Sequence, residues 1–148
     1  MKLTLGGIRG TNPVTGSAHT DFGGDTTSLL VEGADGTRMI IDLGTGLRVI
    51  DLKVRRTREQ RLLNIFLTHY HLDHLIGLPA FSPLYDPSWT LKINGPRIEG
   101  FSVEEVMHRI LAKPFWPLQM DAMRATVQFA DLDAPGAEST RSVGGLRV

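Results

Sequence analysis

Short stretches in which apolar residues alternate with polar ones, or follow one another without interruption, recur along the chain. Such stretches are typical of β-strands when they are rich in β-branched and aromatic residues. The pattern predicts strands over residues 2–5, 26–32, 38–42, 63–67, 90–93 and 126–130. Residues 142–148 are predicted to form a turn followed by the start of a further strand.

Two segments between these predicted strands have the spacing of helices. Apolar residues at positions 47, 50 and 54 predict one apolar helix face. Ser102 and Glu105 have the spacing of a capping box and predict a helix that runs to about residue 112. Strands separated by helices indicate a layered α/β domain, and 148 residues predict a single domain over residues 1–148.

The glycine-rich stretch 6–24 is predicted to be one long loop. A loop of this length is uncommon in a compact domain unless it serves a functional site. We therefore expect it to border such a site.

The highest density of potential metal-binding side chains in the chain follows the predicted strand 63–67. Three of the five histidines and one carboxylate lie within six residues, as His69, His71, Asp73 and His74. Side chains two apart on an extended segment point the same way, so His69 and His71 can converge on one point, with Asp73 and His74 facing a second point close by. Imidazole and carboxylate together suit zinc and similar divalent ions. The competing explanation is structural, with Asp73 as a helix N-cap and the histidines as ordinary core or surface residues.

Four stretches carry a resemblance to a known family. Residues 68–74, T-H-Y-H-L-D-H, resemble the T-H-x-H-x-D-H signature of the metallo-β-lactamase superfamily of metal-dependent hydrolases. Residues 39–46 look like the strand-Asp-x-Gly element that precedes this signature, with Asp42 as its carboxylate. Residues 22–28 and 78–85 are similar to the phosphodiesterase-like branch, which includes ribonuclease Z and the phosphoribosyl cyclic phosphodiesterases; Asp25 stands where that branch has Asn.

The resemblance implies a fold, a set of ligands and a reaction. The family fold is an αββα sandwich, of which this chain would hold only the first half, one mixed sheet plus helices. His69 and His71 would bind one divalent ion, and Asp73 and His74 a second, with Asp73 also orienting the attacking water as the catalytic residue. Asp42 and Thr68 would lie behind these ligands, where hydrogen bonds fix ligand orientation. The implied activity is hydrolysis of a small-molecule or nucleotide phosphodiester.

The number of ligands leaves an alternative open. Two zinc ions require roughly eight coordination positions, and the motif supplies four groups. No histidine follows His108, so the chain resembles a family member truncated at its C-terminus. The alternative is a non-catalytic metal-binding or assembly module, or an enzyme fragment that lacks the second half of the active site. A lone first sheet would also expose an apolar face, which predicts a homo-oligomer or a fragment of a longer protein.

Composition limits which atoms can bind a metal ion and which classes of partner the chain can bind. The chain has no cysteine, so the ion, expected to be Zn with Mn or Fe as alternatives, must be held by nitrogen and oxygen. The formal net charge is zero, which argues against nucleic acid held by bulk electrostatics. The basic segment 53–61 leaves an RNA or phosphate contact as the weaker alternative to a solvated helix end. No apolar run has the length of a membrane span and no signal peptide is evident, so a cytoplasmic protein is expected.

Overall fold

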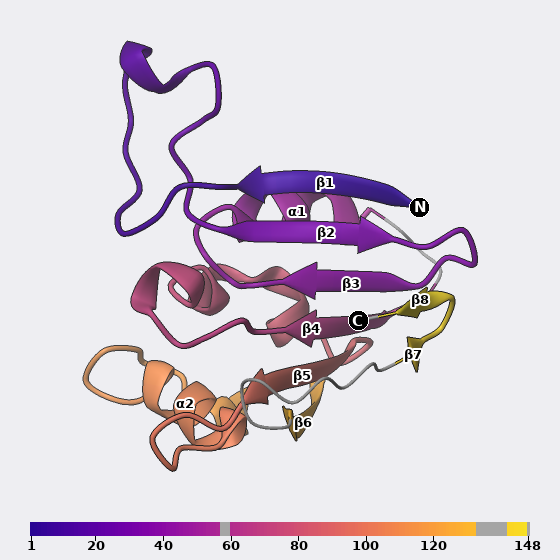
Figure 1. The fold of residues 1–148 in the computed structure, drawn as a ribbon. Coiled ribbons are helices and arrows are strands. Elements are labelled where there is room, and N and C mark those ends of the chain that lie inside the picture. The colour runs from indigo at the N-terminus through magenta and orange to yellow at the C-terminus, as the bar shows by residue number, and fades with distance from the viewer. Residues whose placement is uncertain (57–59, 133–141, 148) are drawn as a thin grey trace.

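A mixed six-stranded sheet forms the centre of the computed structural model, which describes residues 1–56, 60–132 and 142–147 (Figure 1). The strands are β1 (Lys2–Gly7), β2 (Ser28–Glu32), β3 (Arg38–Ile41), β4 (Leu62–Phe66), β5 (Thr90–Pro96) and β6 (Thr126–Leu132). They lie side by side in chain order. β1, β2 and β3 pair antiparallel, whereas β3 to β6 pair parallel. The parallel part requires crossover connections, and helices supply them.

Two α-helices and several short 3-10 turns connect the strands. The α-helices are α1 (Leu47–Val54) and α2 (Val103–Ile110). The 3-10 turns are η1 (Ser17–His19), η2 (Leu72–His74), η3 (Leu78–Ala80), η4 (Ser82–Tyr85) and η5 (Met120–Ala122). Among the described residues, none of these helices has the length and apolar character needed to cross a membrane. The mixed sheet with helices between its strands confirms the α/β fold predicted from the pattern.

The C-terminal stretch differs in detail from its prediction. β7 (Ser142–Val143) precedes the turn and pairs antiparallel with β8 (Leu146–Arg147), so this stretch is a short hairpin rather than a turn and one strand. Part of the basic segment 53–61 lies outside the described residues.

One face of the sheet packs against the helices and forms the main core. Leu63 and Ile65 of β4 point to this face and are fully buried. Leu47, Ile50 and Val54 of α1 are buried in the same cluster, which confirms the predicted apolar helix face. The regular alternation along the strands thus places one layer of helices over one side of the sheet.

The opposite face of the sheet is divided into an apolar half and a polar half. Cross-strand register aligns Leu3, Val31 and Met39 with Asn64 and Lys92 in one row across five strands. The apolar half is partly open, since Leu3 remains 56% exposed. This face is therefore less uniformly apolar than the sequence predicted, and self-association through it stays a prediction.

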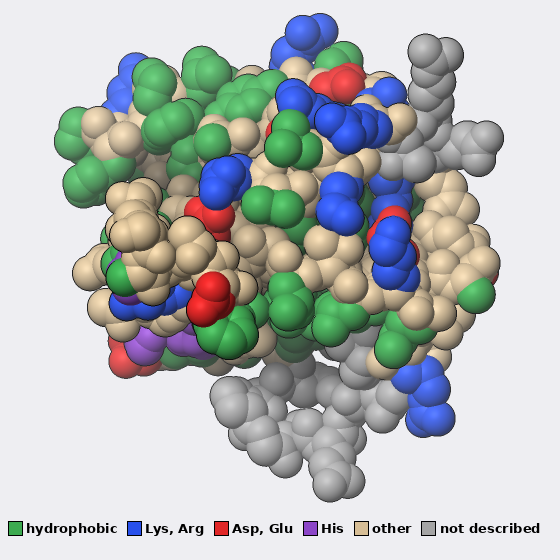
Figure 2. All heavy atoms as spheres, turned by 90° about the horizontal axis from the view of Figure 1, so that it is seen from above, with side chains coloured by type: hydrophobic (Ala, Val, Ile, Leu, Met, Phe, Trp, Pro, Cys, Tyr) green, Lys and Arg blue, Asp and Glu red, His purple; other side chains and the backbone are tan. Residues whose placement is uncertain are grey.

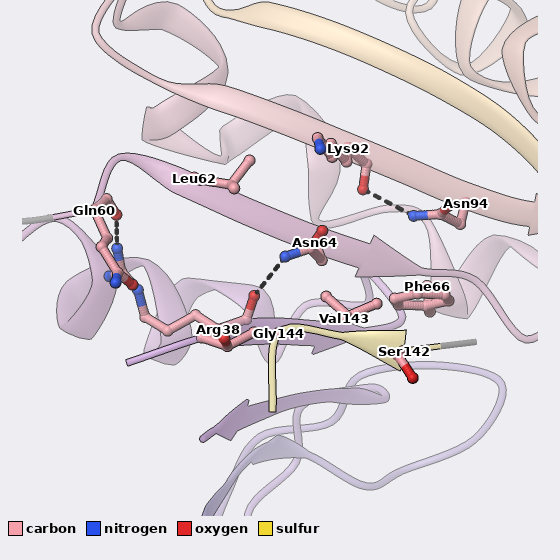
Figure 3. Close-up of a pocket in the computed structure, with 11 residues that line it drawn as sticks. Arg38, Gln60, Leu62, Asn64, Phe66, Lys92, Asn94, Ser142, Val143 and Gly144 are labelled. Atoms are coloured by element: carbon pink, nitrogen blue, oxygen red, sulfur yellow. Dashed lines mark hydrogen bonds between the residues drawn. The ribbon is translucent and has the colours of Figure 1, made fainter. Parts of the chain in front are cut away.

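The β7–β8 hairpin covers part of this second face. Leu146 is buried there against Val31, Met39 and Phe66. Between the hairpin and the sheet lies a groove of about 560 Å³ (Figure 3). Asn64 and Lys92 line it from the sheet beside Phe66, so the groove has a mixed polar and apolar lining.

The capping box at the start of α2 forms as predicted. The Ser102 side chain accepts a hydrogen bond from the Glu105 backbone N–H at 3.2 Å. The Glu105 carboxylate in turn accepts from the Ser102 backbone N–H at 2.8 Å. The hydrogen bonds that the Ser102 backbone N–H and hydroxyl donate to this carboxylate hold the pKa of Glu105 below its ordinary value.

Replacing Ser102 by Ala should lower the free energy of unfolding by about 1 kcal/mol, because the first turn of α2 loses the acceptor for one of its unpaired N–H groups. Urea denaturation followed by circular dichroism measures this change. Glu104→Gln is the matched control, since Glu104 is exposed in the same helical turn. An equal loss in both variants would contradict the capping role.

Candidate metal-binding site

The candidate site lies where the chain leaves β3 and β4, at the carboxyl ends of two neighbouring parallel strands. Asp42 follows β3 directly, and Thr68 follows β4 by two residues. Asp42 has a positive φ of 58°, a left-handed conformation that Asp tolerates better than most residues. This conformation turns the chain sharply at the end of β3. Open α/β sheets commonly bind ligands at such strand ends.

Backbone hydrogen bonds join the loop after β3 to the segment after β4. The Leu43 N–H donates to the His74 carbonyl at 2.7 Å, and the Gly77 N–H donates to the Leu43 carbonyl at 2.8 Å. The two segments approach so closely that a Cβ on Gly77 would lie 2.1 Å from the Gly44 carbonyl oxygen. Glycine is thus required here for the two halves of the site to meet.

The buried carboxylate of Asp42 is the centre of a hydrogen-bond network. Its Oδ1 accepts from the Thr68 backbone N–H at 2.8 Å. The Thr68 hydroxyl lies 2.9 Å from Oδ2 and 3.0 Å from Oδ1. His74 Nδ1 lies 2.9 Å from Oδ2. One carboxylate therefore holds both the strand end and a histidine of the motif.

This network assigns the tautomers of two histidines. An ionised carboxylate only accepts hydrogen bonds, so His74 carries its proton on Nδ1 and the neutral ring keeps a lone pair on Nε2. The single hydroxyl proton of Thr68 points to Asp42. Thr68 Oγ1 must then accept from His69 Nδ1, which lies 2.9 Å away. His69 in its neutral form consequently also has its lone pair on Nε2.

The three histidine rings of the motif lie together. The ring centres of His69 and His71 are 4.5 Å apart, and those of His69 and His74 are 4.2 Å apart. Burial, followed by the neighbouring His74 and His71, lowers the pKa of His69, which favours the neutral ring. Histidine side chains appear at one edge of the molecule in Figure 2.

Asp73 is held by a residue distant in sequence. Its Oδ2 accepts a hydrogen bond from the Thr11 backbone N–H at 2.8 Å, and this bond is the main reason that the pKa of Asp73 is lowered. The same oxygen lies 3.4 Å from His74 Nε2. Two ligands of one tetrahedral zinc ion, each about 2.0 to 2.1 Å from the metal, are separated by about 3.4 Å. Asp73 and His74 thus stand at the separation of two ligands on one ion.

The chemistry of these donors fits a divalent ion, although the full ligand set is not present. Among the residues that the structure describes, no group of three or more His, Cys, Asp or Glu side chains is arranged to hold a metal ion. The donors instead occur as a close pair, Asp73 with His74, next to the rings of His69 and His71. Such pairs leave coordination positions for other groups.

The residues between the predicted ligands point elsewhere. Tyr70 packs against the main core, and its hydroxyl donates to the Pro96 carbonyl. Burial raises the pKa of Tyr70 to about 12. Leu72 is exposed and lines an apolar pocket on the helical side of the sheet. Tyr70 therefore contributes to the packing of the main core.

Two residues have partners that the sequence did not indicate. Asp25, which replaces the Asn of the resembling branch, forms an ion pair with Arg48 of α1 at 2.7 Å, and this contact raises the pKa of Arg48. His108 lies 3.7 Å from Asp121 rather than pairing with Glu104 on its own helix. His108 is thus separate from the three clustered histidines.

The sequence did not indicate the contact of Thr11 with Asp73 or the contacts between Thr26 and Thr45. The Thr26 N–H donates to Thr45 Oγ1 at 2.9 Å, and the Thr45 N–H donates to Thr26 Oγ1 at 2.8 Å. This exchange fixes the loop after Asp42 against the start of β2. The glycine-rich character of the stretch 6–24 was the available signal, but it does not identify Thr11 individually.

Comparisons with known proteins agree with this fold. A model of the metallo-beta-lactamase superfamily matches residues 21–94, half of the chain. Among solved structures, the metallo-beta-lactamase fold protein YhfI from Bacillus subtilis is 17% identical with a TM-score of 0.61, over 96% of this chain and 48% of YhfI. Zn(2+)-bound PqqB from Methylobacterium extorquens is 18% identical with a TM-score of 0.52, over 82% of this chain and 40% of PqqB.

The two structural matches share the fold, and this chain spans about half of the length of each or less. A comparison with curated proteins finds no match. The mixed sheet with its helical layer corresponds to a fragment of the metallo-beta-lactamase fold. The matched residues include Asp42, Thr68 and all four predicted ligands. The chain therefore belongs to the metallo-beta-lactamase superfamily.

Proposed function

We propose that this chain provides the first part of the metal centre of a metal-dependent hydrolase that acts on phosphodiesters. The observation that carries the proposal is the network around Asp42. It orients His69 and His74 with Nδ1 protonated and so makes Nε2 the lone-pair atom of each neutral ring. A carboxylate behind a histidine is the usual support of a metal-binding imidazole.

The proposed ligands divide into two pairs. His69 and His71 would hold one divalent ion, and Asp73 and His74 the second, with zinc as the first choice and manganese or iron as alternatives. The separation of 3.4 Å between Asp73 Oδ2 and His74 Nε2 supports the second pair. A bound divalent ion lowers the pKa of its water from 15.7 to about 7 and stabilises charge on a phosphoryl group.

Asp73 has a further role in this proposal. The Thr11 N–H keeps its carboxylate ionised and fixes one oxygen. An ionised carboxylate held in this way can accept a hydrogen bond from the attacking water and so orient it. Thr11 is then a positioning residue, because it acts on the reaction through Asp73.

The substrate class rests on the resemblance of residues 22–28 and 78–85 to the phosphodiesterase-like branch. In this structure, the first stretch contacts the loop after Asp42. The Gly44 N–H donates to the Thr27 carbonyl at 2.9 Å, and the Gly46 N–H donates to the Thr26 carbonyl at 3.1 Å. Residues 22–28, which resemble the phosphodiesterase-like branch, thus border the proposed metal centre.

A non-catalytic metal-binding module is the second candidate. The four donors fill about half of the positions that two ions need, and within the described part of the chain they do not form a group of three around one point. Such a module would bind metal and would not turn over a phosphodiester.

Metal titration tests the part that both candidates share. The chain should bind a divalent ion saturably by isothermal titration calorimetry, and Asp42→Asn should weaken zinc binding about 10- to 100-fold, because the amide cannot accept from all its present donors. Asp51→Asn is the matched control: Asp51 also accepts hydrogen bonds from a serine, Ser82, outside the cluster. Equal zinc affinity in the two variants would contradict the role of Asp42.

A further inference from the structure

An apolar pocket of about 560 Å³ lies beside the metal-binding motif, between the segment from η2 to η3 and the end of α2 with the residues that follow it. Leu72, Ile76 and Pro79 form one wall. Ile110, Phe115 and Trp116 form the facing wall. Leu72 stands in the chain between His71 and Asp73, so the pocket adjoins the motif without including its ligands.

A chain of hydrogen bonds joins the two walls. The Trp116 indole N–H donates to the Tyr85 hydroxyl at 3.2 Å, and the Tyr85 hydroxyl donates to the Pro79 carbonyl. Backbone N–H groups of Phe115 and Trp116 both donate to the Ala112 carbonyl at 3.0 Å. The pocket is therefore formed in advance, and the indole N–H is already used within the wall.

The rim of the pocket exposes large apolar side chains to water. Phe115 is 82% exposed, Leu72 59% and Ile76 44%. Each square ångström of apolar surface removed from water contributes about 25 cal/mol, so a ligand with an apolar body gains by covering these side chains. Grouped exposure of this kind commonly marks a binding site.

Among the described residues that line the pocket, Arg109 alone is charged. Its guanidinium lies 4.2 Å from the centre of the Phe101 ring. Among the described residues, Arg109 forms no close ion pair, although its charge helps to lower the pKa of Glu105 one helical turn earlier. An arginine guanidinium can bind a ligand carboxylate through two parallel hydrogen bonds.

We propose that this pocket binds a small ligand with an apolar chain or ring and a single carboxylate, with the carboxylate at Arg109 and the apolar body between Ile76 and Phe115. This binding is separate from the proposed hydrolase activity, because it uses none of the predicted metal ligands. It therefore occurs in the metal-free and the metal-loaded chain alike.

Titration of the full chain with decanoate and with decanol, followed by tryptophan fluorescence, tests the proposal, since Trp116 lies in the wall. Decanoate should bind saturably and more tightly than decanol. Phe115→Ser should weaken both ligands about fivefold, and Arg109→Gln should weaken decanoate about fivefold while leaving decanol unchanged. Because both residues are exposed, the variants should keep the far-ultraviolet circular dichroism of the original chain.

Leu5→Ser is the matched control, since Leu5 is an exposed apolar residue on the opposite face of the sheet. It should leave both affinities unchanged. Absence of saturable decanoate binding, or an unchanged decanoate affinity in either pocket variant, would overturn the proposal. Equal binding of decanol and decanoate to the original chain would overturn the assignment of the carboxylate to Arg109.

Discussion

His71→Ala and Asp73→Asn are each expected to lower metal-dependent hydrolysis of bis(p-nitrophenyl) phosphate about a thousandfold or more. The physical reason is that each change removes one proposed ligand, and a metal ion supplies several kilocalories per mole of transition-state stabilisation. Asp73→Asn also removes the ionised carboxylate that we propose orients the water. Release of p-nitrophenolate, measured with zinc and with manganese, gives the rates.

His108→Ala is the control for this experiment. His108 contacts Asp121 and lies outside the cluster, so its removal should leave turnover unchanged. Turnover that survives both ligand substitutions would rule out the proposed hydrolytic site. Zinc binding by the original chain without any turnover would instead favour the non-catalytic module.

Gly77→Ala is expected to lower the free energy of unfolding by about 2 to 4 kcal/mol, because the added methyl group would be forced against backbone. A Cβ at this position would lie 2.1 Å from the Gly44 carbonyl oxygen and 2.8 Å from that of Leu43. Neither atom belongs to a flexible side chain, so relief requires the Asp42 loop and the metal motif to separate. Urea denaturation measures the loss, and zinc affinity should fall with it.

Gly10→Ala provides the matched comparison. No atom lies within 4 Å of a Cβ built on Gly10, and its φ lies outside the left-handed region. This variant should unfold within about 0.5 kcal/mol of the original chain. If Gly77→Ala were as stable as Gly10→Ala, the close approach of the two loops would not constrain the site.

Local patterns were sufficient to predict the elements, because each depends on neighbours in the chain. The short apolar runs in residues 38–42 and 63–67 predict β3 and β4, which the structure confirms. The spacing of Ser102 and Glu105 predicts the capping box, since both partners lie within one helical turn. Ends of strands were less accurate: β5 runs three residues beyond its prediction, because pairing with β6 extends it.

The partners of the site residues could not be predicted in this way. Nothing in the sequence near Asp73 indicates that Thr11, 62 residues away, donates to its carboxylate. The pairing of Asp25 with Arg48 likewise depends on where α1 packs against the sheet. Hydrogen bonds and ion pairs of this range are set by the path of loops between elements, and the residue pattern carries little information on that path.

The sequence by itself determined the order and type of the elements, the location of the imidazoles and carboxylate, and the family, because these depend on periodicity and on a contiguous motif. Tertiary structure alone decided that Asp42 supports both Thr68 and His74, and through Thr68 the orientation of His69. It also decided that the pocket walls meet beside the motif. The physical reason is that both arrangements join chain segments brought together only when β3 and β4 pair in the sheet and α2 packs against it.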